Sequence, residues 1–501
     1  MTTTLGTSER PADPPAGPST PPGRGRRPRP QLFAGMWRWH FYASFLVIPV
    51  LAVLAVTGLI YLFRFQLEPA LHPDVLRVAP AASDERTVGY DAQRAAVEQA
   101  LDRDGLRDAY IVSMTEPGRS AQPTRFTVVL PDETSRDFYV NPYTNEVLGS
   151  LDPDRTLSGI AVRLHGELMT GKIGDAVIEL GACWAIVMAL TGYYLFVRGW
   201  RSRRRATRQA RADTTLVRGM GARALTDARL RQTHAVVGAL AGVTLLGLLV
   251  SGLPWTGVWG ARVQQLVTAG GSSLWSDDHG GASQPTTTMD ESLPHSHAGE
   301  VPWGLGASQR PTSDVGDVTG SIANLDTAVV VADEHGLQHP YTILLPDTPD
   351  GTFAVIGYAF HSPGQERTVH VDRYTGAVVG TYGYADYAGL AKAVSQGIAL
   401  HEGRRFGTLN LVLSAAMCLG IVVLCVSGPI MWWRRRPKNA GRIGAPRGRL
   451  PIAATPAVLV AVVALGLLLP LFGLSLIAIL VLDRLVLRRS PALSRWFDVR
   501  S

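Results

Sequence analysis

Four histidines occur beside long apolar segments, in two kinds of position. Two of them begin an apolar segment, and the other two precede one by a short stretch, as in "VRLHGELMTG" and "IALHEGRRFG". The first kind comprises His40 and His234, and the second comprises His165 and His401. A neutral imidazole is a good ligand for iron and can serve on either side of a haem. Ionisable groups at membrane depth are costly, so by default they suggest a function.

The spacing around these histidines repeats between the two halves of the chain. A Thr-Gly or Ser-Gly pair occupies the seventeenth and eighteenth positions after each histidine of the first kind, and the twenty-sixth and twenty-seventh after each of the second. The pairs are Thr57-Gly58 and Ser251-Gly252 in the first case, and Thr191-Gly192 and Ser427-Gly428 in the second. An interfacial polar residue need not keep such a register, so the offsets favour a cofactor site. A duplication alone would, however, also preserve histidines that are used structurally.

The elements that must position these residues are apolar segments near the roughly 20 residues that a helix needs to cross a bilayer. In a chain of 501 residues that is 46% hydrophobic, we expect an integral membrane α-helical bundle of four core helices, arranged as an internal duplication. A C-terminal hydrophobic hairpin would follow, turning at Leu469–Gly473, with one kinked helix or a re-entrant hairpin as alternatives. The expected segments are 33–65, 156–198 and 386–434 (each of these two with a preceding short helix), 233–258, and 451–487 for the hairpin.

The net charge of +7 comes from basic residues beside the apolar segments, so we expect no nucleic-acid partner. Excess Lys and Arg mark cytoplasmic loops. This rule predicts a multi-pass protein of the plasma (inner) membrane with a cytoplasmic N-terminus. The cytoplasmic parts would be a disordered N-terminus 1–32, basic loops 199–232 and 435–450, and the tail 488–501. No C-x-x-C-H occurs, which excludes covalent c-type haem attachment.

The regions placed outside also repeat. "FYVNPYTNEVLGS" (138–150) matches "VHVDRYTGAVVGT" (369–381), and each is typical of a strand, a tight turn and a returning strand. We therefore expect two small extracytoplasmic α+β domains, at 75–155 and 312–385. The Gly-, Ser-, Thr- and Pro-rich stretch 259–311 between them is expected to be a flexible loop.

This topology sorts the histidines by depth into two layers. His40 and His234 would form an inner pair near the cytoplasmic face, and His165 and His401 an outer pair. A pseudo-two-fold axis along the membrane normal would bring each pair face to face, as in helical bundles that hold a haem. A flat macrocycle needs helices without bulky side chains beside it. We therefore expect haem packing against Gly58 and Gly252 in the outer layer, and against Gly192 and Gly428 in the inner layer.

Some charged residues near the proposed ligands are open to two interpretations. They are candidates for pairing with haem propionates, but topology-setting charge explains them equally well. They are Arg38, Arg231, Arg404 and Arg405. Glu179, inside the second apolar segment, is a candidate for a proton or propionate contact.

The order of these motifs resembles a known family. "RWHFYASFLVIPVLAVLAVTGLIYLF", "LHGELMTG", "GLPWTGVWG", "LHEGRRFG" and "SGPIMWWRRRP", with the two strand–turn–strand repeats, are similar to the PepSY-associated transmembrane helix family. That family includes iron-regulated membrane proteins and di-haem ferric-siderophore reductases. The resemblance implies two b-type haems held by His40, His165, His234 and His401. It also implies electron transfer to a ferric siderophore or other ferric chelate outside.

Other functions stay open at this point. No G-x-G-x-x-G fingerprint follows a plausible cytoplasmic strand, so the electron donor would be a quinol or a separate cytoplasmic reductase. A membrane-anchored PepSY binding or regulatory protein without redox activity is the main alternative. Transport of haem or siderophore without redox chemistry is a third.

Overall fold

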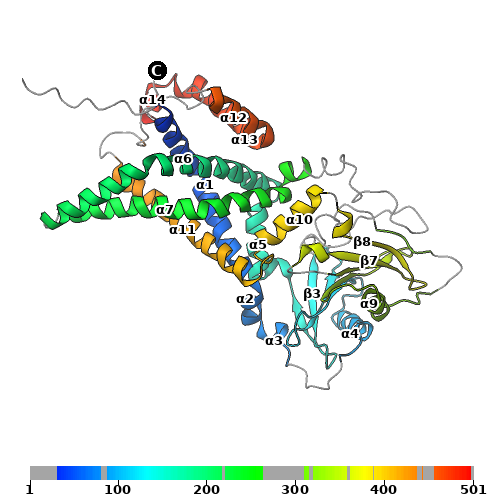
Figure 1. Ribbon diagram of the computed structural model, residues 1–501. Helices are drawn as coiled ribbons and strands as arrows, with labels where there is room; N and C mark the ends of the chain where they lie inside the picture. Colours follow the sequence, from blue (N-terminus) through cyan, green and yellow to red (C-terminus); the bar gives the residue numbers. More distant parts are fainter. Residues whose placement is uncertain are drawn as a thin grey trace, which may run out of the picture.

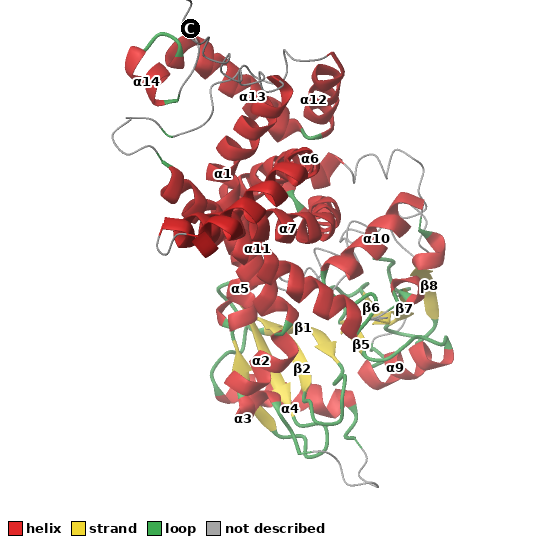
Figure 2. Cartoon of the chain, turned by 60° about the vertical axis from the view of Figure 1, so that its left-hand side comes forward, coloured by secondary structure: helices red, strands yellow, loops and turns green. Residues whose placement is uncertain are grey.

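The protein consists of a helical bundle with a β-sheet attached at one end (Figure 1). The computed structural model describes residues 31–79, 87–216, 220–262, 310–314, 320–357, 362–387, 389–436, 443 and 456–497. The last described helix (Pro491–Trp496) and the start of the first long helix lie at the end of the bundle away from the sheet (Figures 1 and 2). We call the two ends of the bundle the sheet end and the far end.

Four long helices form the bundle. They are α1 (Gln31–Leu62), α6 (Lys172–Leu216), α7 (Met220–Gly252) and α11 (Thr408–Arg435). Both α1 and α7 pack against α6 and against α11, so the four helices close into a ring. Small or branched apolar side chains, among them Val47, Cys183 and Ile421, fill its centre and are almost fully buried.

Five helices of the described chain are long and apolar enough to cross a membrane. They are Leu32–Leu62, Lys172–Gln209, Leu225–Trp255, Thr408–Arg435 and Pro470–Leu487. Except in Lys172–Gln209, most of the apolar stretch of each helix is not buried inside the protein, as expected for helices whose apolar sides face lipid. The protein is therefore a multi-pass membrane protein of helical type with an α+β region.

Two shorter helices lie between the bundle and the sheet. They are α5 (Leu157–Glu167), which packs on α1, and α10 (Gly389–His401), which packs on α7. Thr156 caps the start of α5 by accepting a hydrogen bond from the Gly159 amide, and α5 ends where Leu168 enters the left-handed region, at φ 49°. The helix is interrupted between α5 and α6. His165 therefore reaches its position without an unbroken 27-residue helix.

An eight-stranded antiparallel sheet lies next to these short helices. Its order is β4-β3-β2-β1-β5-β6-β7-β8. The strands are β1 (Tyr110–Thr115), β2 (Thr124–Val129), β3 (Ser135–Val140), β4 (Val147–Leu151), β5 (Tyr341–Leu344), β6 (Thr352–Gly357), β7 (Arg367–Asp372) and β8 (Val378–Gly383). Helices α4 (Tyr90–Arg103) and α9 (Leu325–Glu334) bury apolar residues against one face of the sheet (Figure 2). The two α+β domains therefore share one sheet, joined by β1 and β5, where the sequence predicted two small domains.

The repeat in the sequence is also a repeat in the structure. The side chains of Asn141 and Asp372 each accept hydrogen bonds from backbone amides two and three residues later, which sets the two tight turns. The equivalent residues Asn145 and Gly376 both adopt positive φ, 60° and 72°. Each turn is preceded by a register shift in the ladder, after Tyr139 in one half and after His370 in the other.

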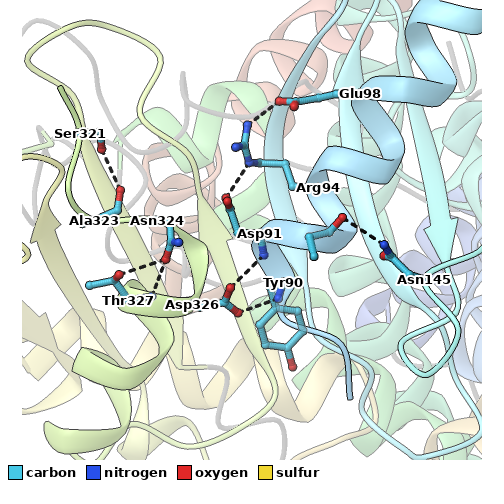
Figure 3. A network of polar contacts seen from close by, with 11 residues as sticks. Tyr90, Asp91, Arg94, Glu98, Asn145, Ser321, Ala323, Asn324, Asp326 and Thr327 are labelled. Carbon is cyan, nitrogen blue, oxygen red and sulfur yellow. Dashed lines mark hydrogen bonds and ion pairs between the residues drawn. The ribbon is translucent and has the colours of Figure 1, made fainter. Parts of the chain in front are cut away.

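A polar joint connects the two domains at the start of α4. The carboxylate of Asp326, on α9, accepts hydrogen bonds from the backbone amides of Tyr90 at 2.6 Å and Asp91 at 3.2 Å (Figure 3). It thus supplies to α4 the negative cap that helix N-termini favour. Gly89 is required there, because a side chain at this position would come within 2.9 Å of the Asp326 carboxylate.

The remaining described helices are short or C-terminal. They are α2 (Arg64–Leu71), α3 (Pro73–Leu76), α12 (Pro456–Leu468), α13 (Pro470–Leu482) and α14 (Pro491–Trp496), with a π-helical turn at Asp483–Leu487. Helices α12 and α13 form the expected hydrophobic hairpin, which reverses at Leu469. The Trp259 indole donates to the Leu468 carbonyl near the sheet end of α7, and Tyr42 donates to the Phe497 carbonyl at the far end.

The predicted basic loop between the second and third apolar segments is largely helical. The stretch 199–232 was predicted as a basic loop, but most of it is helix, because α6 continues to Leu216 and α7 begins at Met220. Arginine is a good helix former, so "RSRRRATRQAR" prolongs the helix once it leaves the apolar segment. The predicted disorder of 1–32 falls outside the described residues except for Gln31 and Leu32, with which α1 begins. The predicted flexible loop 259–311 also falls outside them, except for residues 259–262, which are helical and not a loop, and residues 310–311.

Replacement of Asp326 by Ala tests the joint between the domains. We expect the start of α4 to lose about 1 kcal/mol of stabilisation, because two amides lose their acceptor. Hydrogen–deuterium exchange at residues 90–93 should become faster, and the exposed Asp102→Ala on the same helix serves as the control. Unchanged exchange in Asp326→Ala would show that the joint does not hold α4.

Candidate metal centre

Each of the four histidines binds the hydroxyl of a Thr-Gly or Ser-Gly pair through its Nδ1 atom. The distances from Nδ1 to the hydroxyl oxygen are between 2.8 and 3.4 Å. The pairs of residues are His40 with Thr191, His165 with Thr57, His234 with Ser427, and His401 with Ser251. One local arrangement is therefore built four times, twice at each end of the bundle.

The partners of Nδ1 define the protonation state of the rings. His40 and His401 also place Nδ1 at 3.0 Å from the carbonyls of Met188 and Leu248, and a carbonyl can only accept. Nδ1 must then carry the hydrogen. For His165, the Thr57 hydroxyl donates its own proton to the Val53 carbonyl, so its oxygen is left to accept from Nδ1.

The same logic applies to His234, which is held by a single hydroxyl. Ser427 directs its hydroxyl to the Leu424 carbonyl at 3.4 Å and accepts from Nδ1 of His234 at 2.8 Å. In all four rings Nε2 is thus the nitrogen with a free lone pair. It makes no hydrogen bond within the described part of the chain. A hydrogen bond at one ring nitrogen that orients the other toward a metal is the usual arrangement for a ligating histidine.

The outer pair, His165 and His401, has the separation that a shared metal requires. Their ring centres are 6.2 Å apart and their planes are at 88°. A metal–imidazole bond of about 2 Å, with about 1 Å more to each ring centre, places two rings on one metal about 6 Å apart. The two rings come from α5 and α10, one from each half of the chain, as the pseudo-two-fold axis predicts.

The inner pair is formed by His40 on α1 and His234 on α7, at the far end of the bundle. The two rings lie within electrostatic range of each other. His40 is held by α6 and His234 by α11, so the two sites of this layer are again related by the duplication. The structure therefore brings together the same two pairs that the sequence predicted by depth.

The glycines make room for the imidazole rings themselves. A Cβ atom on Gly252 would lie 3.0 Å from Cε1 of His401, and one on Gly192 would lie 3.1 Å from Cε1 of His40. Gly58 and Gly428 lie 3.5 and 3.9 Å from the rings of His165 and His234 on the same measure. The glycines are in the predicted layers. Their direct neighbour is the ligand ring, where the sequence led us to expect a macrocycle.

Burial keeps the outer rings neutral. It lowers the pKa of His165 to about 4, and the nearby His401 lowers it further in the same direction. Burial also lowers the pKa of His401, against a smaller opposing effect of Glu402. Both imidazoles are therefore uncharged at neutral pH, which is the form that binds metals.

The donor set suits a metal that brings most of its own ligands. Within the described residues, no group of three or more His, Cys, Asp or Glu is placed to bind a metal ion. A metal held by protein alone usually has three or four such ligands. Two neighbouring imidazoles per layer instead suit a haem, whose macrocycle supplies four nitrogens.

Some neighbours of the rings were not predicted from the sequence. The Trp255 ring packs edge-on against His401 at 5.5 Å between ring centres. The signal was the motif "GLPW", which places this tryptophan three residues after Gly252. Cys418 comes within 3.8 Å of the position of a Gly58 Cβ, beside His165.

The charged candidates have partners of their own. Arg38 donates to the Phe497 carbonyl and lies over the Tyr42 ring. Arg404 pairs with Glu402, and Arg405 donates to Gln396. Arg231 lies within electrostatic range of Arg435, and Asp227 also acts on Arg435. Glu179 is fully buried and accepts hydrogen bonds from the amides of Val258 and Trp259, so one of its oxygens has a structural task.

A bulky residue in place of Gly252 should displace the His401 ring. If each histidine pair holds a haem, Gly252→Val should remove one of the two, because its Cβ and the branches beyond it occupy the space of Cε1. Gly247→Val is the matched control, since a Cβ at Gly247, on the same helix, meets no atom within 4 Å. Equal haem content in the two variants, measured by pyridine haemochrome, would contradict this role for Gly252.

Comparison with known families matches most of the chain to one family. The PepSY-associated TM region family matches residues 37–435, a range that contains all four histidines and their Thr-Gly and Ser-Gly partners. Comparison with curated proteins gives no match. The resemblance noted in the sequence is thereby confirmed at the level of the family. The chain belongs to the PepSY-associated TM region family.

Proposed function

We propose that this protein is a di-haem b electron-transfer protein that carries electrons across the plasma membrane and reduces a ferric siderophore or another ferric chelate outside. The observation that carries the proposal is the outer pair of imidazoles. Two neutral rings from the two halves of the chain have their centres 6.2 Å apart, with Nδ1 of each hydrogen-bonded and Nε2 of each available. When bound, haem supplies reversible one-electron chemistry.

The inner pair would hold the second haem, and its distance from the outer pair fits a path through the membrane. His40 and Thr57, the partner of outer His165, are both on α1 and are 17 residues apart. That is about 25 Å of helix, against about 30 Å of hydrocarbon. The two layers would thus lie near opposite faces. With a single haem site, an electron would have to cross most of the membrane without a second cofactor.

The protein residues would hold each centre in one redox-competent geometry. The hydroxyls of Thr57, Thr191, Ser251 and Ser427 accept from Nδ1, which fixes the orientation of each ring and makes it a stronger donor to the metal. Removal of the His165 and His401 rings from water holds these two imidazoles neutral. Imidazole on both sides leaves no open coordination position, which suits electron transfer better than chemistry at the iron.

The orientation follows from the charges. The far end of the bundle carries the arginines that follow the apolar part of α6 and that end α11, which marks it as cytoplasmic. The sheet and the outer pair would then face outside, where ferric chelates are met. Reduction releases iron because Fe(II) binds hard oxygen ligands less strongly than Fe(III). A quinol or a cytoplasmic reductase would supply the electrons.

Removal of single ligands tests the two layers. The purified protein should contain about two haems per polypeptide, and His165→Ala and His234→Ala should each lose about one. The two variants should retain different haems, distinguishable by their reduction potentials. His335→Ala, an exposed histidine at the end of α9, is the control. A colourless protein from haem-replete cells would favour the binding or regulatory alternative.

Reoxidation of the reduced protein tests the reaction. Protein reduced with dithionite and freed of excess reductant should be reoxidised when a ferric siderophore is added, with a shift of the haem bands and release of Fe(II) to a ferrous indicator. A gallium complex of the same siderophore, which has the same shape and cannot be reduced, should leave the spectrum unchanged. Haem that stays reduced in the presence of the ferric complex would rule out the reductase activity.

A further inference from the structure

A buried polar network lies against the outer pair and is not used by the proposed electron path. Its centre is Glu366, which follows a short 3-10 helix (Pro363–Gln365) and has only 7% of its surface exposed. Its carboxylate accepts a hydrogen bond at 3.1 Å from Ser395, a buried residue of α10. Helix α10 ends at the outer ligand His401, six residues or about 9 Å further along.

The groups that face Glu366 come from three elements. Ser395 belongs to α10, Glu402 and Arg404 belong to the turn after α10, and Tyr387 follows the 3-10 helix Tyr384–Asp386. The Arg404 guanidinium is paired with Glu402, whose other oxygen accepts from the Tyr61 hydroxyl at 3.3 Å. Glu366 makes no ion pair within the described chain.

Among these groups, Glu366 is the one suited to exchange a proton at neutral pH. Arginine stays protonated, and the Glu402 carboxylate is already engaged by Arg404 and by the Tyr61 hydroxyl. Burial raises the pKa of Glu366 to about 7, against smaller opposing effects of Ser395 and Arg404, while the charge of Glu402 raises it further. The carboxylate and the carboxylic acid therefore have similar populations.

We propose that Glu366 is a proton-binding site coupled to the outer redox centre, so that arrival of an electron there is accompanied by protonation of this carboxylate. This inference rests on the proposed function. An external one-electron donor supplies the electron, and bulk water on the sheet side supplies the proton. One O–H bond forms on the Glu366 carboxylate, and it breaks again when the electron leaves for the ferric chelate.

The coupling has a simple electrostatic cause. An added electron makes a weakly screened site more negative, and this favours the neutral form of a nearby carboxyl group. The converse also holds, because a protonated Glu366 makes the outer centre easier to reduce. The proton would be useful in the reaction, since ligands that release a metal take up protons in its place.

Potentiometric titration of the haem-loaded protein between pH 5.5 and 8.5 tests the coupling. One of the two haems should show a potential that falls as the pH rises through about 7, by up to a tenfold change in electron affinity per pH unit, which is about 59 mV. Glu366→Gln should abolish this slope and leave the other haem unchanged. Glu334→Gln, an exposed carboxylate on α9, is the matched control.

Ser395→Ala separates coupling from a structural effect. Loss of the hydrogen bond from Ser395 disfavours the carboxylate, so the midpoint of the pH-dependent region should move to higher pH and the slope should persist. A slope that is the same in Glu366→Gln and in the native protein would overturn the inference while leaving electron transfer intact. Absence of haem would overturn both.

The stability of the protein provides a second readout that does not use haem. Glu366 has a folded pKa above its unfolded value of about 4.3, so its protonation stabilises the fold below that value, and this contribution disappears as the pH rises to about 7. The melting temperature of native protein should therefore fall more between pH 4.5 and 7 than that of Glu366→Gln. Parallel curves would show that Glu366 does not titrate there.

Discussion

The candidate metal centre depends on one hydrogen bond, from a histidine Nδ1 to the hydroxyl of a Thr-Gly or Ser-Gly pair. This hydrogen bond is repeated four times. In an apolar helix such a hydroxyl usually donates to a carbonyl one turn earlier, as Thr57, Thr191, Ser251 and Ser427 do. Its oxygen can then only accept from the ring. The hydroxyl therefore selects the tautomer and leaves Nε2 for a metal. The following glycine permits the ring to approach the helix so closely.

The duplication gives these contacts their arrangement. Each half supplies one ligand to each layer, and each ligand is held by a helix of its own half: α6 holds His40, α1 holds His165, α11 holds His234 and α7 holds His401. A metal bound between two opposed rings would therefore link the halves. The shared sheet, joined through β1 and β5, links them a second time outside the bundle. The proposed proton site at Glu366 lies between these two links.

Much of this organisation could be predicted from the sequence, because it depends on length, period and offset. Apolar segments long enough to span a membrane predicted the long helices, and the offsets from histidine to Thr-Gly or Ser-Gly predicted which residues share a layer. The Asn141 and Asp372 turns were predictable from turn chemistry. The continuous sheet was not, because pairing of Met114 with Ile343 depends on how two domains meet. The length of α6 was missed because basic charge predicts the side of the membrane and not the end of a helix. The contact of Nδ1 with a hydroxyl was missed because it depends on the rotation of one helix against another.

The most direct test of the central claim is pulsed electron paramagnetic resonance of the oxidised protein, combined with ¹⁵N labelling of histidine. The proposed di-haem arrangement predicts two low-spin ferric centres per polypeptide. Each should be coupled to the nitrogens of two axial imidazoles, and the remote nitrogen of each imidazole should be protonated. A centre with a single imidazole, or with a deprotonated remote nitrogen, would contradict the arrangement described for Nδ1 and Nε2. A protein with no ferric signal would contradict the whole account of the four histidines.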